Sequence, residues 1–165
     1  MGVQGESPTT SRGVQPPPNL GLVDGLVQLS AAVQAVVARV AAGADLSMAQ
    51  ARLLGVLRDR QPSMAQLAGL LELDKSSATG LIDRAERRGL VRRVDVPEDG
   101  RSFRVLLTAK GRRLTEELAD EVTRGVAALT DGLSEADRRK LAHLAGRVVV
   151  HDATARGIDL STSTN

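Results

Sequence analysis

Hydrophobic residues recur at helical spacing along both ends of this chain, and the spacing changes only in the middle. Near the N-terminus they alternate in steps of four and three, which places them on one face of a helix as a heptad seam. The seam consists of Leu22, Leu26, Leu29, Val33, Val36 and Val40. Similar apolar lines predict a long helix through Leu114 to Leu133 and a last helix through Leu141 to Val149.

Residues with helix-capping side chains mark where most of the predicted helices begin. Ser63 is followed three residues later by Gln66, which is the spacing of a capping box. Single N-caps are predicted at Ser47, Asp74, Thr108 and Ser134. The resulting helices cover about residues 20–42, 48–58, 64–71 and 75–88, and two more begin after residues 108 and 134.

The middle of the chain changes to a hairpin pattern. Gly89 is a typical residue for ending a helix, and it is followed by two strand candidates, Leu90 to Val96 and Ser102 to Leu107. A Pro-Glu-Asp-Gly turn joins them. The element order predicts a mainly α protein with a small β-hairpin wing, that is, a winged helix-turn-helix with N- and C-terminal dimerisation helices. A winged helix places one helix in the major groove of DNA and its hairpin against the neighbouring backbone or minor groove.

The composition excludes several classes of chemistry. The chain has no cysteine, so disulfides, thiol nucleophiles and cysteine metal ligands are excluded. His143 and His151 have no adjacent carboxylate cluster, and no phosphate-binding glycine loop is present. We therefore expect no enzyme, no metal and no cofactor. The N-terminus lacks the features of a signal peptide, and Arg39, Asp45 and Arg52 interrupt the most hydrophobic region, so we expect a cytoplasmic protein without a membrane span.

Positive charge is concentrated in the predicted winged helix. The segment from Asp74 to Arg113 holds eleven basic and six acidic residues, an excess of five positive charges in a chain whose net charge is +2. A basic module on an acidic remainder is expected where one face meets phosphate groups. A solvated charged surface is the alternative. We expect double-stranded DNA as the partner.

The predicted organisation has five parts. Residues 1–19 form a disordered arm, 20–46 an N-terminal dimerisation helix, 47–111 the DNA-binding domain, 112–152 the C-terminal dimerisation helices, and 153–165 a flexible tail. Val23, Val27 and Val37 widen the first seam beyond what one intramolecular neighbour needs. Soluble proteins rarely leave so much aliphatic surface exposed, so we expect a homodimer, with a self-contained bundle as the alternative.

Three segments resemble the multiple-antibiotic-resistance regulator (MarR) family of winged-helix repressors. They are SMAQLAGLLELDKSS from Ser63, LIDRAERRGLVRR from Leu81, and a wing signature. The signature residues are Asp99, Arg101, Val105, Leu107, Thr108 and Gly111. The resemblance covers about Leu22 to His151 and implies an obligate dimer, a palindromic operator and, in many members, a small ligand that weakens DNA binding.

The family's recognition-helix face maps onto Ser76, Ser77, Thr79 and Arg84, and its wing arginine onto Arg101. Two positions depart from the family's pattern. Gly80 stands where many relatives carry a long polar or basic side chain, and Glu72 stands at a turn position where glycine is common. The resemblance also implies an effector cleft between the dimer helices and the winged domain. Here Leu, Val, Ala and Phe103 would line it with few polar anchors, which suits a small apolar or aromatic effector; control by protein abundance without a ligand is the alternative.

The chemistry of the side chains assigns a role to each candidate. Ser76, Ser77 and Thr79 can contact base edges, although they could instead cap the helix or face solvent. Lys75 and Arg84 are expected to hold phosphates, with an intrahelical pair to Asp83 as the alternative for Arg84.

The basic residues of the hairpin are expected to contact DNA as well. Arg101 is expected in the minor groove, oriented by Asp99. Arg92, Arg93 and Arg104 are expected along the DNA backbone. Leu67, Leu71, Leu81 and Ile82 are expected in the core. A winged helix used for protein contact without sequence-specific DNA binding is the other function that this pattern allows.

Overall fold

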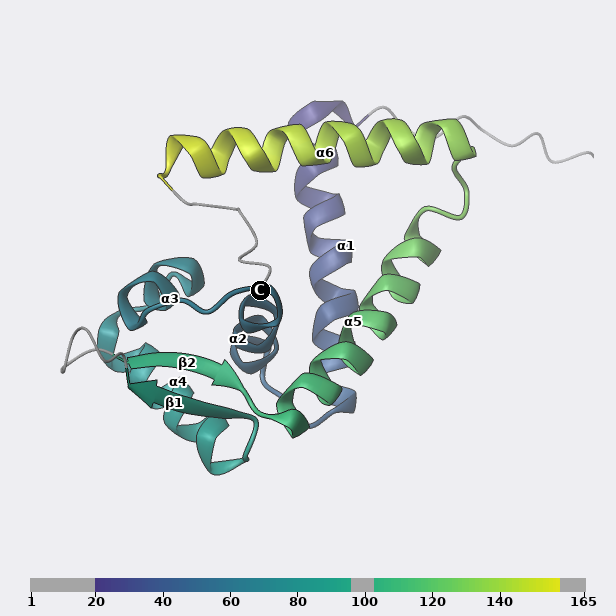
Figure 1. The fold of residues 1–165 in the computed structure, drawn as a ribbon. Helices are drawn as coiled ribbons and strands as arrows, with labels where there is room; N and C mark the ends of the chain where they lie inside the picture. The colour runs from purple at the N-terminus through teal and green to yellow at the C-terminus, as the bar shows by residue number, and fades with distance from the viewer. Residues whose placement is uncertain (1–19, 96–102, 158–165) are drawn as a thin grey trace, which may run out of the picture.

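The computed structural model describes residues 20–95 and 103–157, which form six helices and a two-stranded hairpin (Figure 1). The predicted fold class and element order are confirmed. The helices are α1 (Gly21–Gly43), α2 (Met48–Asp59), α3 (Met64–Leu71), α4 (Lys75–Arg87), α5 (Ala109–Leu129) and α6 (Glu135–Ala155). The strands are β1 (Val91–Asp95) and β2 (Phe103–Leu107), and they pair antiparallel.

Five of the six helices begin where their capping side chains predict. The Ser63 hydroxyl accepts a hydrogen bond from the Gln66 backbone N–H, and the Gln66 side chain accepts one from the Ser63 backbone, as expected for a capping box. Ser47 forms a second box with Gln50, which the sequence also permits. The predicted caps at Asp74, Thr108 and Ser134 are confirmed as well. Each cap satisfies a backbone donor that would otherwise lie unpaired at the helix start.

The hydrophobic core lies in the winged helix, where α2, α3, α4 and the hairpin meet. Leu67, Leu71, Leu81 and Ile82, the expected core residues, are all less than 5% exposed. Their neighbours in the core include Leu53, Leu54, Leu90 and Val105. The core is therefore aliphatic, in keeping with a chain that has one aromatic residue.

Helix α5 is fixed against the end of α4 by a close backbone approach. The Thr108 backbone N–H donates to the Leu90 carbonyl at 3.0 Å, and its hydroxyl donates to the Gly89 carbonyl at 2.7 Å. A Cβ atom at Gly111 would collide with the carbonyl oxygen of Leu90. The glycine of the wing signature thus allows the first turn of α5 to sit on the hairpin base.

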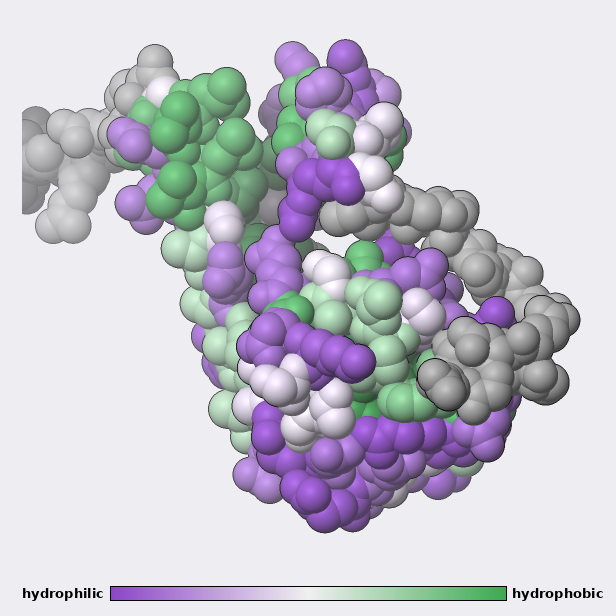
Figure 2. All heavy atoms as spheres, turned by 90° about the vertical axis from the view of Figure 1, so that its left-hand side faces the viewer, coloured by the Kyte–Doolittle hydropathy of each residue, from purple (hydrophilic) through white to green (hydrophobic). Residues whose placement is uncertain are grey.

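The long helices leave a broad hydrophobic surface uncovered. α1 and α5 extend side by side from the winged helix, and α6 lies across their far ends (Figure 1). Large exposed apolar residues occur on these helices and the ends next to them. They are Leu20, Leu22, Val23, Leu26, Val27, Leu29, Leu129, Leu133, Leu144, Val148, Val149 and Val150. Figure 2 shows hydrophobic residues gathered toward this end of the molecule, while the winged helix is mainly hydrophilic on the viewed face.

The expectation that charged residues interrupt every apolar run of membrane-spanning length was wrong for α1. This helix has 23 residues and is apolar enough to cross a membrane by length and composition. Arg39 lies in its last third, and Asp45 and Arg52 lie beyond its end, so these charges do not interrupt it. Because a helix that packs in a protein interface has the same composition, this finding is weak evidence for a membrane location.

Two predicted boundary segments fall partly or wholly outside the described residues. The predicted arm, 1–19, lies outside them. α6 continues to Ala155, and Ala153 is buried, so the first three residues of the predicted tail are helical. The remaining division into domains stays a prediction.

Candidate nucleic-acid interface

The start of α4 is organised by the carboxylate of Asp74. One of its oxygens accepts the Ser77 backbone N–H at 2.9 Å and the Ser76 hydroxyl at 2.5 Å. The other oxygen accepts the Ser77 hydroxyl at 2.7 Å. These bonds hold the pKa of Asp74 well below its usual range, chiefly because the Ser76 and Ser77 hydroxyls stabilise the charged form. The two serines are therefore oriented by a group that sequence reasoning treated only as a cap.

This arrangement changes what the two serines offer to a ligand. A hydroxyl has one hydrogen to donate and two lone pairs that accept. Since Ser76 and Ser77 both donate to Asp74, their oxygens remain as hydrogen-bond acceptors on the exposed surface of α4. In the sequence, the spacing Asp-x-Ser-Ser at a helix start indicates that both serine hydroxyls can donate to the aspartate.

The other predicted residues of α4 are placed along the same helix. The Thr79 hydroxyl donates to the Lys75 carbonyl at 2.8 Å, so its methyl group is the part left for contacts. Lys75 and Arg84 are exposed, and within residues 20–95 and 103–157 neither forms an ion pair. The alternative pair between Arg84 and Asp83 is not formed in the described structure, because Asp83 pairs with Arg93.

Arg93 is held differently from the expectation that it follows the DNA backbone. Its guanidinium pairs with both Asp83 and Glu86 of α4, and its backbone N–H donates to Glu86 at 3.2 Å. It also lies 5.2 Å from the centroid of the Phe103 ring. Arg93 therefore ties β1 and β2 to α4. A role for it on DNA stays a prediction.

The hairpin register explains why Arg93 differs from its neighbours. Arg92 pairs with Leu106 and Val94 pairs with Arg104, so Arg92 and Arg104 share one face of the hairpin. Arg93 lies on the opposite face with Val91 and Val105, which are buried against the core. Arg92 and Arg104 are both exposed. The face that can meet DNA phosphates therefore carries these two arginines.

The predicted wing residues Asp99 and Arg101 lie outside the described residues, so their roles stay predictions.

Glu72, in the turn between α3 and α4, adopts the left-handed backbone conformation, with φ 56°, that glycine would favour there. Its carboxylate accepts a hydrogen bond from Arg156 at 2.8 Å. The helix-turn-helix turn thus keeps its geometry with a non-glycine residue.

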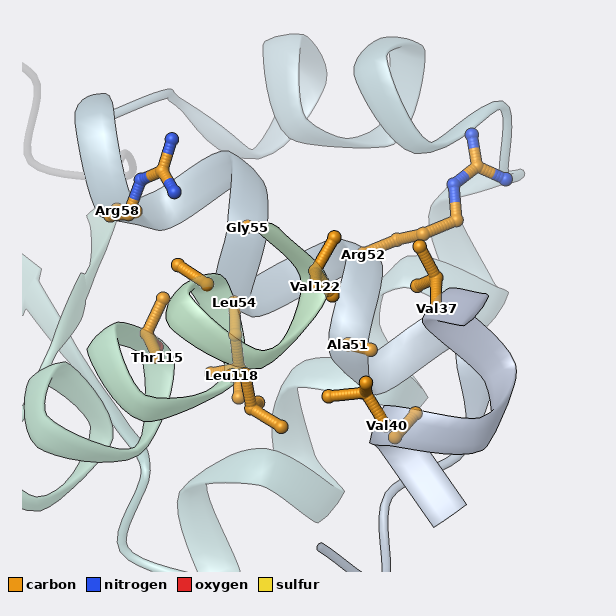
Figure 3. Close-up of a pocket in the computed structure, with 12 residues that line it drawn as sticks. Val37, Val40, Ala51, Arg52, Leu54, Gly55, Arg58, Thr115, Leu118 and Val122 are labelled. Atoms are coloured by element: carbon orange, nitrogen blue, oxygen red, sulfur yellow. The ribbon is translucent and has the colours of Figure 1, made fainter. Parts of the chain in front are cut away.

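A separate pocket lies between α1, α2 and α5 (Figure 3). It has a volume of about 250 Å³ and mainly apolar walls, including Val40, Leu54 and Leu118. Two arginines from α2, Arg52 and Arg58, also line it. The lining is thus largely apolar with few polar side chains, as expected, and the two arginines are the charged groups among them. Phe103 does not line this pocket and contacts Arg93 instead.

The two pocket arginines differ in their partners. Arg58 donates to both carboxylate oxygens of Asp59, with its closest contact at 2.8 Å. Arg52 is exposed and forms no ion pair with the part of the chain that the structure describes. Arg52 can therefore meet an anionic group at the pocket without breaking an existing pair.

The two histidines lie elsewhere, along an open groove between α6 and the start of α1. His143, His151 and Leu22 line this groove together with residues of α6. Among residues 20–95 and 103–157, no group of three or more metal-binding side chains comes together.

Comparisons with known proteins agree with this geometry. The model of the MarR family matches residues 44–102. The HTH-type transcriptional regulator PecS of Dickeya dadantii is 30% identical over 110 residues, which are 64% of this chain and 66% of PecS, so the match falls just short of two thirds of that relative.

Solved structures show the same fold over nearly the whole of each neighbour. NadR in complex with 4-hydroxyphenylacetate has a TM-score of 0.65 at 26% identity, covering 86% of this chain and 97% of NadR. BpsR of Bordetella bronchiseptica, whose DNA binding is regulated by 6-hydroxynicotinic acid, has a TM-score of 0.63 at 25% identity, covering 81% and 97%. With its capped α4 and two-stranded wing, the chain has the fold of the MarR family of transcriptional regulators and resembles them in sequence over residues 44–102.

Proposed function

We propose that this chain is a homodimeric, sequence-specific DNA-binding repressor that binds a palindromic operator. The exposed surface of α4 carries this proposal. It presents the Ser76 and Ser77 oxygens together with the cations of Lys75 and Arg84. Neither cation is paired with an acidic side chain of the described residues. The Arg92 and Arg104 face of the hairpin adds further exposed positive charge. A surface of this kind can contact base edges and phosphates together.

The uncovered apolar faces support the homodimer. Large exposed side chains on α1 and α6, such as Leu26 and Val148, would be removed from water by a second copy. In a two-fold dimer the two recognition helices should lie about one DNA turn apart, roughly 34–36 Å. A palindromic operator follows from this symmetry.

The most informative test is a gel shift with the DNA upstream of the protein's own gene, at two salt concentrations. We expect binding that weakens steeply as salt rises, since phosphate contacts release counterions. We expect Arg101→Ala to lower the affinity for all operators by about 1–3 kcal/mol. Unchanged affinity would remove the role of Arg101. Footprints confined to single half-sites would contradict the dimer.

The rival function, a winged helix for protein contact, gives a different result in the same experiment. It would leave duplex DNA unshifted even at low salt. The excess of basic over acidic residues from Asp74 to Arg113 favours DNA as the partner. A cytoplasmic location belongs to the same proposal, since a regulator must reach the chromosome.

The pocket between α1, α2 and α5 supports a small aromatic or apolar acid as the effector. Its apolar walls would bury a single ring, and Arg52 would pair with the carboxylate. The ligands named with NadR and BpsR are both aromatic acids, which fits this chemistry. A ligand regulates only if it binds the form that leaves DNA more tightly than the form that holds it.

Calorimetry with 4-hydroxyphenylacetate and 6-hydroxynicotinate tests the effector site. We expect at least one of them to bind and to weaken the DNA complex, and Arg52→Ala to weaken that binding by roughly ten-fold or more. Arg39→Ala, a change of another arginine outside the pocket lining, is the matched control. Equal loss in both variants would place the ligand elsewhere.

A further inference from the structure

A hollow of about 390 Å³ opens on the surface of α4 beside the start of α2. Ala49, Leu73 and Leu81 give it apolar walls. It exists at this place because Gly80, which also lines it, has no side chain. Gly80 follows Ser76 by one helical turn and precedes Arg84 by another, so all three lie on one face of α4.

The polar groups around the hollow accept hydrogen bonds or carry positive charge. Ser76 and Ser77 line it, and their hydroxyl hydrogens are directed to Asp74, which leaves their oxygens as acceptors. Arg84 folds over Gly80, with its Nη1 3.4 Å from the place where a Cβ would stand. No acidic side chain is among the described residues that line the hollow.

We propose that this hollow receives the C5 methyl group of a thymine, which makes Gly80 a specificity-determining residue. The proposal rests on the proposed DNA-binding function. In the major groove an A·T pair presents the thymine methyl together with the adenine amino group, a hydrogen-bond donor. The hollow offers apolar walls for the methyl, and the Ser76 and Ser77 oxygens can accept from the amino group.

The same geometry disfavours a backbone phosphate of DNA in the hollow. A backbone phosphate needs hydrogen-bond donors, and Arg84 could supply them. The serine hydrogens are already held by Asp74, whose carboxylate is negative, so a phosphate in the hollow would face acceptor oxygens and a like charge. A methyl group meets no such repulsion.

Replacing single thymines by deoxyuridine tests the proposal, because uracil lacks only the C5 methyl group. A preferred operator is first selected from a random duplex pool with the full chain. Each thymine is then replaced in turn, and wild type and Gly80→Ala are titrated against every duplex. At one thymine in each half-site, wild type should lose roughly four-fold in affinity, the value expected for one buried methyl group.

Gly80→Ala places a methyl group of the protein where the thymine methyl would lie. This variant should lose the preference for thymine over uracil at that position and keep it elsewhere. Its new Cβ would meet no atom closer than the flexible end of Arg84, so α4 should fold normally. Gly69→Ala on α3 is the matched control, since a Cβ there would meet nothing within 4 Å and Gly69 does not line the hollow.

Each outcome decides between the alternatives. A scan in which no thymine matters to wild type overturns the inference while leaving DNA binding intact. A thymine preference that persists in Gly80→Ala also overturns it, because the methyl then binds elsewhere. Failure to select any duplex removes the proposed function and the inference with it. Loss of the preference in Gly80→Ala but not in Gly69→Ala supports the inference.

Discussion

Asp74 shows how one side chain can serve both the stability of a helix and the chemistry of its surface. Its carboxylate accepts three hydrogen bonds from Ser76 and Ser77, and the residue is exposed to solvent. The helix start therefore depends on a charge that sits where DNA is proposed to bind. Without this charge the serine hydrogens would be released, and each hydroxyl could then act as a donor.

We predict that Asp74→Asn lowers the melting temperature at neutral pH, because the neutral amide has one oxygen and an NH2 group in place of the two carboxylate oxygens that accept from Ser76 and Ser77. The pKa of Asp74 is depressed below its ordinary 3.8, so its contribution is fully present above that pH. It is lost as the pH falls through the lower pKa of the folded state. Melting curves of both proteins across this range should converge in acid. A difference that grows in acid would contradict the assignment.

Gly111 gives a second prediction at a single residue. Gly111→Ala should destabilise the fold by about 1–3 kcal/mol, because the added methyl group has to displace the Leu90 carbonyl or the first turn of α5. Urea denaturation measures the loss. Gly132→Ala is the matched control, since a Cβ there would meet nothing within 4 Å. Equal stability of the two variants would show that α5 moves without cost.

At the scale of the elements, the attachment of the hairpin to α4 depends on Arg93. We predict that Arg93→Ala costs about 1 kcal/mol of stability, since it leaves Asp83 and Glu86 without their shared partner at a site that solvent partly screens. Amide hydrogen exchange in β1 should become faster.

Arg92→Ala is the comparison, because Arg92 is exposed on the other face of the hairpin. It should leave stability unchanged and lower DNA affinity with a smaller salt dependence. If Arg93→Ala weakened DNA binding without any change in stability or exchange, Arg93 would be a DNA contact after all.

The elements were largely predictable from the sequence because their signals are local. Capping residues and apolar spacing located the helices, and the alternating strand pattern located the hairpin. The separate role of Arg93 was harder to predict, although its position follows from strand parity. Arg93 shares its hairpin face with Val91 and Val105, and that alternation is visible in the sequence once the register is known.

Long-range contacts limited the prediction of the candidate sites. The hollow at Gly80 needs Ala49 from α2 and Leu73 from the preceding turn, and no local spacing places these beside α4. The pocket arginines, Arg52 and Arg58, likewise acquire their setting from α1 and α5. From the sequence, Gly80 is a position that lacks the long side chain of many relatives. In the structure, the space left at Gly80 is a hollow lined by residues of α2, α4 and the turn before α4.

For the whole molecule, the proposed homodimer gives the clearest prediction. Val148→Asp should shift the chain toward single subunits in sedimentation, because an unpaired carboxylate would be buried in the proposed interface at a cost of roughly 2 kcal/mol or more. Lys140→Ala, at an exposed charged position of the same helix, is the control. Operator affinity should fall together with dimerisation. A wild-type chain that sediments as one subunit would contradict the dimer.

The bare apolar faces of α1 and α6 also bear on how gene expression would respond to the amount of regulator. If only paired subunits can span both half-sites, operator occupancy in dilute conditions rises with the square of the subunit number. A modest fall in the synthesis of the regulator, or a modest rise in its degradation, would then release the promoter. This release would occur over a narrower range of regulator concentration than for a regulator that binds DNA as a single subunit. Such a threshold would arise from the aliphatic helices, with no effector required.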